Sequence, residues 1–300
     1  MIPTFYVHSV LWLVILQISS AFTILRHNLT SQITQSAHPI NFTTNSSLPL
    51  TTQKLSDTRL TCDGSTYKRN LIRDSCVDAA STIPRDEEPL SVADRTYGDI
   101  DIPLPARWIS GDGRCVFDIA KASNDPIEVD FASLKDFSTA ASMLIGSCLG
   151  RGGRQGGIVT GLGASGRLGL IMTSYAPTVT CGEAESFFPR DSCHDIISLM
   201  PATKELDAFG RVGQRWVEIE IPNTFYSVSF PGGKEDRRCK STVDSSGLRD
   251  VASWYDMWQG VVAVDGMCGR FNRVGYAGGI GSSRSLKIDL EMNDEVTATA

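Results

Sequence analysis

The pattern of apolar and polar positions predicts helices and short strands after the first 60 residues. Apolar side chains between Leu134 and Leu144 recur at the i, i+3 and i+7 spacing of a helix with one buried face. A second helix is expected over Leu248 to Val264, where Trp254 and Trp258 lie four residues apart. The strict alternation from Trp216 to Ile221 is typical of a half-buried strand.

A repeated segment indicates that one folded unit is present twice. Arg73–Pro84 returns as Arg190–Pro201, with Arg, Asp, Ser, Cys, Asp, Ser and Pro identical and in the same order. Asp74 or Ser75 is expected to cap a short helix in the first copy, as Asp or Ser does in the second. Such a repeat is the usual trace of a duplicated unit.

Other landmarks follow the repeated segment in one order. Each copy shows an opening cysteine, an aromatic-Gly pair, an Arg-Trp pair, a Gly-x-Cys at a helix end and a Gly-rich turn into a strand. In sequence order these are Cys62, Tyr97-Gly98, Arg107-Trp108, Gly146-Ser147-Cys148 and Gly161 to Ser165, against Cys181, Phe209-Gly210, Arg215-Trp216, Gly266-Met267-Cys268 and Gly279 to Ser283.

The expected fold class is therefore α+β, with two tandem disulfide-stabilised units. Each unit is a small antiparallel sheet packed against one or two helices. The expected segments are a signal peptide (1–21), a disordered Ser/Thr/Asn-rich glycosylated segment (22–61), the first copy (62–180), the second copy (181–290) and a disordered tail (291–300).

The cysteines support this division. All eight follow the Ser/Thr-rich segment, and their even number is typical of disulfides in an oxidising compartment. No C-x-x-C pair is present, so a metal site is not expected. Pairing within each copy is the simplest arrangement, although unequal spacing leaves open whether Cys239 corresponds to Cys115. The cysteines are Cys62, Cys76, Cys115, Cys148, Cys181, Cys193, Cys239 and Cys268.

The start of the chain predicts export. An apolar stretch from Ser9 to Ile18 precedes small residues ending at Ala21, the form of a cleavable signal peptide. A signal anchor would need a longer apolar run, so no stable membrane insertion is expected. Three glycosylation sequons follow closely at Asn28, Asn41 and Asn45, which indicates a secreted, extracellular glycoprotein.

The chain has a formal net charge of −6, and its basic residues are scattered along the sequence. Both features argue against a nucleic-acid partner. Of the four histidines only His194 lies in the expected folded region, and no G-x-S-x-G surrounds a serine. The G-x-G-x-x-G at Gly161 to Gly166 leads into a strand rather than a helix, which favours a tight turn over a nucleotide site. No catalytic residue, cofactor or metal is assigned.

Two sets of residues remain candidates for function. Arg107, Trp108, Arg215 and Trp216 can bind a ligand, because arginine binds carboxylates and aromatic rings stack on sugars, or the tryptophans can serve as core. Carboxylates such as Asp112 and Asp118 can serve a glycosidase, although hairpin geometry also accounts for Asp112 in its Gly-Asp-Gly turn.

Several short motifs of the first copy carry a resemblance to known proteins: Cys62-Asp63-Gly64-x-x-Tyr67, Ser75-Cys76-x-Asp78-Ala79, Ile83-Pro84, Tyr97-Gly98-Asp99, Leu104-Pro105-x-Arg107-Trp108-Ile109-Ser110 and Asp112-Gly113-x-Cys115. On these motifs, the chain from about residue 62 to 181 resembles a group of small secreted cysteine-rich proteins of filamentous fungi. More distantly, the order of its cysteines, long helix and terminal strand is similar to fungal killer-toxin-like effectors, which are compact disulfide-bonded α/β sandwiches. The resemblance implies a non-enzymatic protein acting on a host, a competitor or a cell wall.

The leading hypothesis is a secreted fungal glycoprotein that acts by binding, like an effector or toxin, a protein or glycan target outside the cell. The first alternative is a secreted hydrolase that acts on wall polysaccharide through carboxylates. The second is a structural protein of the wall or matrix.

Overall fold

The structure is a computed structural model that describes residues 58–121, 129–150, 152–184, 190–227 and 238–293. All of them belong to one compact unit that extends from Gln53. The signal peptide, the sequons at Asn28, Asn41 and Asn45, and the tail after Asn293 lie outside the described residues.

In the described part of the first copy, ten elements are present. These are β1 (Arg59–Cys62), α2 (Arg73–Ser81), β2 (Leu90–Asp94), β3 (Ile102–Leu104), β4 (Ala106–Ile109), β5 (Val116–Lys121), β6 (Asp130–Ala132), α3 (Leu134–Cys148), β7 (Gly157–Leu162) and β8 (Leu168–Thr173).

The residues that the structure describes in the second copy form ten corresponding elements and one extra turn of 3-10 helix. These are β9 (Thr178–Ala184), α4 (Arg190–Leu199), β10 (Leu206–Arg211), β11 (Ile219–Ile221), β12 (Asn223–Tyr226), β13 (Arg238–Ser245), β14 (Arg249–Ser253), α5 (Trp254–Met267), η2 (Gly269–Phe271), β15 (Arg273–Ile280) and β16 (Leu286–Asn293). The predicted helix over Leu248 to Val264 was wrong at its start, because Arg249–Ser253 is a strand and Ser253 caps the helix.

The two copies have the same topology. The first holds a five-stranded sheet in the order β1-β7-β8-β5-β4, and the second holds its counterpart in the order β9-β15-β16-β13-β12. Each also has a three-stranded sheet, β3-β2-β6 and β11-β10-β14, with one parallel and one antiparallel pairing. The chain is therefore α+β with two tandem units, as the repeated segment predicts, and each copy has its own apolar core.

Four disulfides join equivalent places in the two copies. Cys62–Cys148 and Cys181–Cys268 tie the first strand of a copy to the end of its long helix. Cys76–Cys115 and Cys193–Cys239 tie the short helix to the strand that follows the hairpin turn. Cys239 therefore corresponds to Cys115. The second copy has a longer connection between these two cysteines, with a separation of 46 residues against 39.

The repeated serine beside each of these cysteines makes hydrogen bonds outside its helix rather than capping it. Helix α2 begins after Ile72 without a side-chain cap, so the predicted cap at Asp74 or Ser75 was wrong. The Ser75 hydroxyl donates instead to Asp112, in the turn that leads to Cys115. In the second copy the Ser192 hydroxyl accepts a hydrogen bond from the backbone N–H of Cys239. In each copy, the repeated segment is therefore joined to the region of the partner cysteine by the disulfide and by a hydrogen bond of the neighbouring serine.

The Gly-rich turns are explained by one buried carboxylate in each copy. Asp130 accepts from the backbone N–H and the hydroxyl of Ser165, and Asp250 does the same for Ser285. At Gly163 φ is +79°, and a Cβ there would lie 2.5 Å from an Asp130 oxygen. Only glycine suits such a turn, which confirms a tight turn at this glycine motif.

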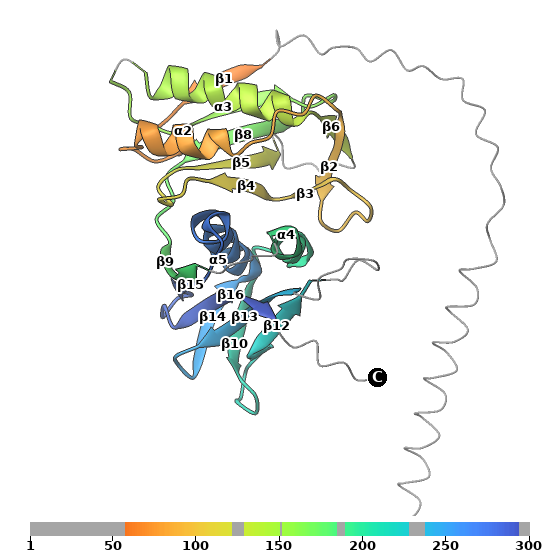
Figure 1. Cartoon of the computed structure of the whole chain (residues 1–300), viewed down its shortest axis with the longest axis vertical. Coiled ribbons are helices and arrows are strands. Elements are labelled where there is room, and N and C mark those ends of the chain that lie inside the picture. The colour runs from red at the N-terminus through yellow and green to blue at the C-terminus, as the bar shows by residue number, and fades with distance from the viewer. Residues whose placement is uncertain (1–57, 122–128, 151, 185–189, 228–237, 294–300) are drawn as a thin grey trace, which may run out of the picture. The chain divides into compact units, whose positions relative to one another are not determined.

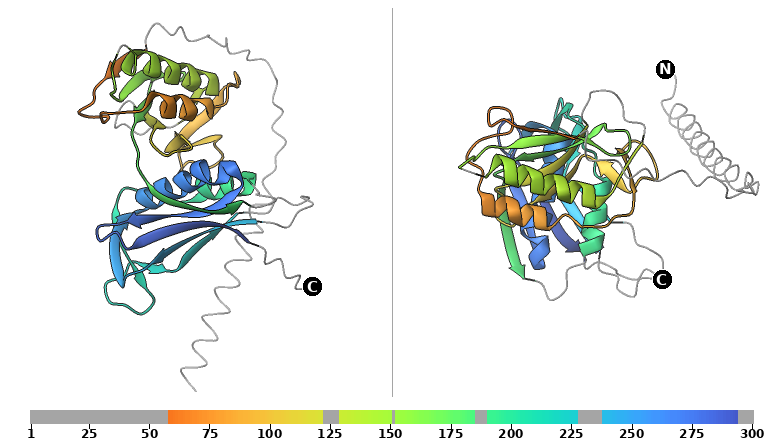
Figure 2. Two further views of the ribbon diagram at one scale, coloured as in Figure 1. Left: turned by 60° about the vertical axis from the view of Figure 1, so that its left-hand side comes forward. Right: turned by 90° about the horizontal axis from the view of Figure 1, so that it is seen from above.

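Helix α5 packs against two sheets, whereas α3 packs against one. Figures 1 and 2 show helices α2 and α3 on one face of the first sheet and helix α5 beyond its other face. A small apolar cluster joins Ile109 and Val116 of that sheet to Ala263 of α5. The positions of α5 that face the first copy include Trp258, Val262 and Gly266, where α3 has Ser138, Ser142 and Gly146. A helix with apolar side chains on both faces is buried on both.

We predict opposite effects for the same substitution at two equivalent glycines. A Cβ at Gly266 would lie 2.1 Å from Cγ2 of Ile109, whereas nothing lies within 4 Å of one at Gly146. Gly266→Ala should therefore lower the free energy of unfolding by about 1–3 kcal/mol through overpacking. Gly146→Ala should raise it by about 0.5–1 kcal/mol through helix propensity. Urea unfolding measures both, and equal effects at the two sites would contradict this contact between the copies.

Candidate functional site

A cleft of about 740 Å³ lies between the two copies and follows β4, the edge strand of the first sheet. The first copy contributes β3, β4 and nearby loops, and the second contributes α4, α5 and η2. The lining includes both members of the first predicted Arg-Trp pair. The main lining residues are Pro103, Pro105, Ala106, Arg107, Trp108, Ile109, His194, Ile197, Trp258, Val262, Asp265 and Arg270.

Arg107 is buried in the wall of this cleft and paired with a carboxylate. Its Nε and Nη2 donate to the two oxygens of Asp118 at 2.5 and 2.7 Å, and its side chain is 3% exposed. Burial alone would lower the pKa of Arg107, but the charge and hydrogen bonds of Asp118 outweigh burial and hold the pKa above its usual value. The guanidinium also lies over the rings of Tyr175 and Trp258, at 4.9 and 5.6 Å from their centroids.

Arg95 links the first copy to the end of a helix of the second. Its Nη1 donates to the carbonyl oxygens of Ile197, Ser198 and Met200, at the C-terminal end of α4. A cation there is favoured by the helix dipole. Burial lowers the pKa of Arg95 to about 10, which leaves it charged at neutral pH. Its guanidinium lies 5.2 Å from the centroid of the Trp258 ring, so two arginines of the first copy contact one indole of the second.

A third arginine crosses between the copies in the other direction. Arg270 donates from both Nη1 and Nη2 to Asp78 at 2.9 Å, and the same carboxylate accepts from the backbone N–H of Gly111. The hydrogen bonds from Arg270 are the main reason that the pKa of Asp78 is lowered. Asp78 therefore lies beyond the first turn of α2 and at the contact between the copies.

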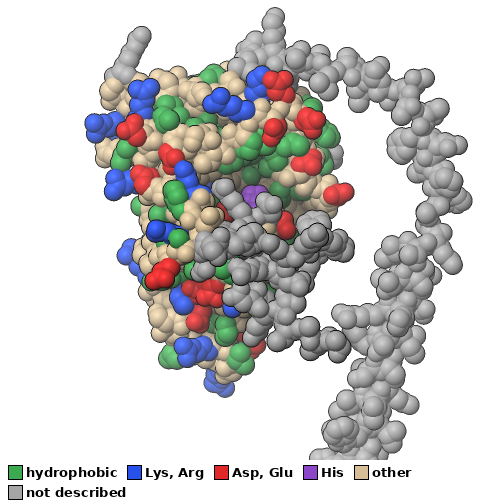
Figure 3. Space-filling view, in the orientation of Figure 1, with side chains coloured by type: hydrophobic (Ala, Val, Ile, Leu, Met, Phe, Trp, Pro, Cys, Tyr) green, Lys and Arg blue, Asp and Glu red, His purple; other side chains and the backbone are tan. Residues whose placement is uncertain are grey.

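The rest of the cleft is mostly apolar. Trp108 is half-buried and packs on Phe137 of the first core, with 6.2 Å between ring centroids. His194 is exposed on α4 and also lines the cleft. Figure 3 shows the hollow, with the purple histidine inside it and hydrophobic side chains gathered around its upper rim.

The second Arg-Trp pair is elsewhere, so the two pairs do not correspond. Strand register aligns β4 with β12, which places Thr224 opposite Thr242 where the first copy has Arg107 opposite Asp118. Trp108 accordingly corresponds to Phe225. Arg215 and Trp216 lie in the connection between β10 and β11, and Trp216 is 79% exposed.

The aromatic-Gly pairs were misaligned in the same way. Pairing between β2 and β3 and between β10 and β11 matches Phe209-Gly210 with Val92-Ala93. Tyr97-Gly98 lies in the connection after β2. The two copies align correctly at the proline that precedes each edge strand, which is Pro105 before β4 and Pro222 before β12. Each of these prolines follows a cis peptide bond.

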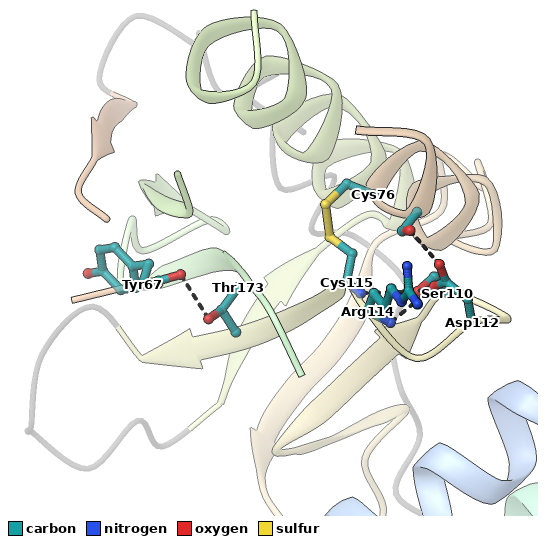
Figure 4. Close-up of a disulfide and its surroundings, with 8 residues drawn as sticks. Tyr67, Cys76, Ser110, Asp112, Arg114, Cys115 and Thr173 are labelled. Carbon is teal, nitrogen blue, oxygen red and sulfur yellow. Dashed lines mark hydrogen bonds between the residues drawn. A yellow bond between two sulfur atoms is a disulfide. The ribbon is translucent and has the colours of Figure 1, made fainter. Parts of the chain in front are cut away.

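The carboxylates considered for hydrolysis have structural partners. Asp118 is held by Arg107. Asp112 accepts from the hydroxyls of Ser75 and Ser110, and Figure 4 shows Asp112 and Ser110 near the Cys76–Cys115 disulfide. Burial would raise the pKa of Asp112, but the hydrogen bonds from Ser110 and Ser75 outweigh it and lower the pKa.

Sequence reasoning assigned neither Arg95 nor Arg270 to the site. Trp258 was the only signal, because it lies on the helix face where the first copy has Ser138. Among the described residues, no group of three His, Cys, Asp or Glu could hold a metal ion, and no helix is long and apolar enough to cross a membrane.

Comparisons with protein-family models, with curated proteins and with solved structures find no match to this chain. The similarity to secreted fungal proteins and killer-toxin-like effectors therefore stays a prediction from the sequence.

We predict that removing one partner of the Arg107–Asp118 ion pair destabilises the protein more than replacing both partners together. Asp118→Thr leaves a buried guanidinium without its carboxylate and should lower the free energy of unfolding by about 3–5 kcal/mol. The double variant Arg107→Thr, Asp118→Thr reproduces the Thr224–Thr242 pair of the second copy and should lose less than Asp118→Thr. Urea unfolding of the two single variants and the double gives the coupling. Losses that simply add would contradict the pairing.

We also predict a dependence on pH at Asp78. Because its pKa is lowered in the folded protein, the stability it contributes is present above about pH 4 and is lost as the pH falls through the folded pKa. The difference in unfolding free energy between the native protein and Asp78→Asn should therefore shrink between pH 6 and pH 3. Glu88→Gln, at an exposed position, is the control, and a difference that stays constant would contradict the prediction.

Proposed function

We propose that this chain is a secreted fungal glycoprotein that acts by binding, in the manner of an effector or toxin, and that the cleft between the copies holds its target. The four disulfides support an extracellular protein. The observation that carries the proposal is the cleft itself, because its volume and mostly apolar lining are those of a ligand site.

The lining favours a protein segment with apolar side chains over a hydroxyl-rich sugar. Trp108, Ile109 and Val262 offer apolar contacts, and the lining as a whole has few carboxylates. Since β4 is the last strand of its sheet, one row of its backbone N–H and C=O groups faces away from the sheet. An extended peptide can pair with such an edge and place alternate side chains in the cleft.

Three buried donors add polar groups for such a segment. Nε of Arg95, Nη1 of Arg107 and Nε1 of Trp258 have no hydrogen-bond partner among the described residues. All three side chains line the cleft. A peptide carbonyl oxygen that reaches the floor of the cleft would satisfy a buried donor, which favours binding because an unpaired buried donor is costly.

We predict that Trp108 is needed for binding. Peptides selected from a displayed library against the disulfide-bonded protein should bind the native chain, and Trp108→Ala should weaken them about thirtyfold, the effect of losing an aromatic anchor. Calorimetry measures the affinities. Phe225→Ala is the matched control, because Phe225 holds the corresponding position of the second copy and does not line the cleft.

Two results would overturn the proposal. Selected peptides that bind Trp108→Ala as tightly as the native chain would place the site elsewhere. Release of sugars from wall polysaccharide, lost in Asp112→Asn or Asp118→Asn, would show a hydrolase instead. A glycan array measured in parallel identifies a sugar ligand, and binding there that depends on Trp108 would keep the cleft but exclude a peptide.

A further inference from the structure

A second surface, at the end of β10, combines exposed apolar and basic side chains. We call it the tip and define it as Arg211 to Trp216 together with Leu248 and Arg249. Within it Trp216 is 79% exposed, Val212 70% and Leu248 73%. None of the tip residues lines the cleft, so this surface is independent of the proposed ligand site.

The tip is a built surface, held by close packing at Gly210. The backbone N–H of Gln214 donates to the carbonyl oxygen of Arg211, and the side-chain oxygen of Gln214 accepts from the backbone N–H of Arg211. These two hydrogen bonds close a tight turn. A Cβ at Gly210 would lie 2.8 Å from the Gln214 side chain and 3.2 Å from the Leu248 carbonyl oxygen. The turn and Leu248 therefore lie side by side.

Trp216 is held outward in a conformation that costs energy. Its φ is +64°, in the left-handed region that bulky side chains rarely adopt. Glycine or asparagine would adopt this backbone more easily. A strained residue that gains no burial suggests a role outside the fold.

The charge of the tip is opposite to that of the chain. Arg211, Arg215 and Arg249 are all exposed there, while the whole chain has a net charge of −6. The nearby carboxylate of Glu218 accepts from the backbone N–H of Ala208, on the strand behind the turn. The tip therefore suits an anionic partner.

In the first copy, the connection after β2 corresponds to the connection after β10 that forms the tip, and it has another role. Register places Val212 where the first copy has Arg95, which contacts helix α4 of the second copy. The described residues hold no third copy that this connection of the second copy could contact. Its connection projects beyond the sheet at the far end from the first copy, as Figures 1 and 2 show.

We propose that the tip docks this protein peripherally on an anionic lipid surface. A projecting indole flanked by valine, leucine and three arginines matches the interface of a bilayer, where indole lies among the headgroups and guanidinium contacts phosphate. A projecting tip suits a broad, flat partner better than a small ligand, which needs a concave site. The contact requires no spanning segment.

The test is sedimentation with lipid vesicles, using the secreted, disulfide-bonded protein. Vesicles of phosphatidylcholine mixed with phosphatidylserine should bind it, and phosphatidylcholine alone should bind it much less. Trp216→Asn keeps a residue suited to positive φ and should weaken binding about tenfold. Arg215→Ser and Arg249→Ser should each weaken it about fivefold.

Two variants serve as matched controls, and fluorescence gives a second measurement. Leu206→Ser removes an exposed apolar side chain at the opposite end of β10, and Arg167→Ser removes an exposed arginine of the first copy. Neither should change binding. Trp254 and Trp258 are buried and Trp108 is half-buried, whereas Trp216 is 79% exposed, so an emission shift to the blue on binding should come mainly from Trp216 and vanish in Trp216→Asn.

Three outcomes would overturn the proposal. These are no binding to either vesicle, equal binding to both vesicles, and binding to anionic vesicles that Trp216→Asn leaves unchanged. The last would mean attraction by charge alone. Loss of peptide binding in Trp108→Ala bears only on the cleft, so the two proposals fail separately.

Discussion

Helix α5 is packed between two sheets, and the arrangement of both copies depends on that contact. One face covers the core of the second copy, and the other meets the outer face of the first sheet through Ala263, Gly266 and Trp258. Burying an indole between two arginines joins apolar burial to the attraction between cation and ring. The cleft exists because this contact leaves the edge strand β4 beside helix α4.

The outer faces of the two five-stranded sheets also differ in polarity. The outer face of the first sheet has Ile109, Val116 and Ile171, and register places Tyr226, Lys240 and Asp289 at the corresponding positions of the second. Lys240–Glu291 and Lys287–Asp289 ion pairs cover that second face. A polar outer face ends a stack of repeats, since a third helix would bury charges there.

The fold was more predictable from the sequence than the site. Cysteines align correctly because each must meet a partner at a fixed distance, so their order follows the structure. The Arg-Trp and aromatic-Gly pairs do not, because two-residue matches carry no such constraint and arise by chance. Arg95 and Arg270 gave no signal, since their role comes from contacts between copies that lie 102 or more residues apart.

The differences between copies indicate which residues serve more than the fold. At one position of one sheet, the first copy has a buried Arg107–Asp118 pair and the second has two threonines. The strand pair therefore forms without the ion pair, and burying two charges brings little stability by itself. What the arginine adds is a cation on the faces of Trp258 and Tyr175 in the wall of the cleft. The ion pair is thus better explained by the contact between the copies, and by the cleft beside it, than by the stability of one sheet.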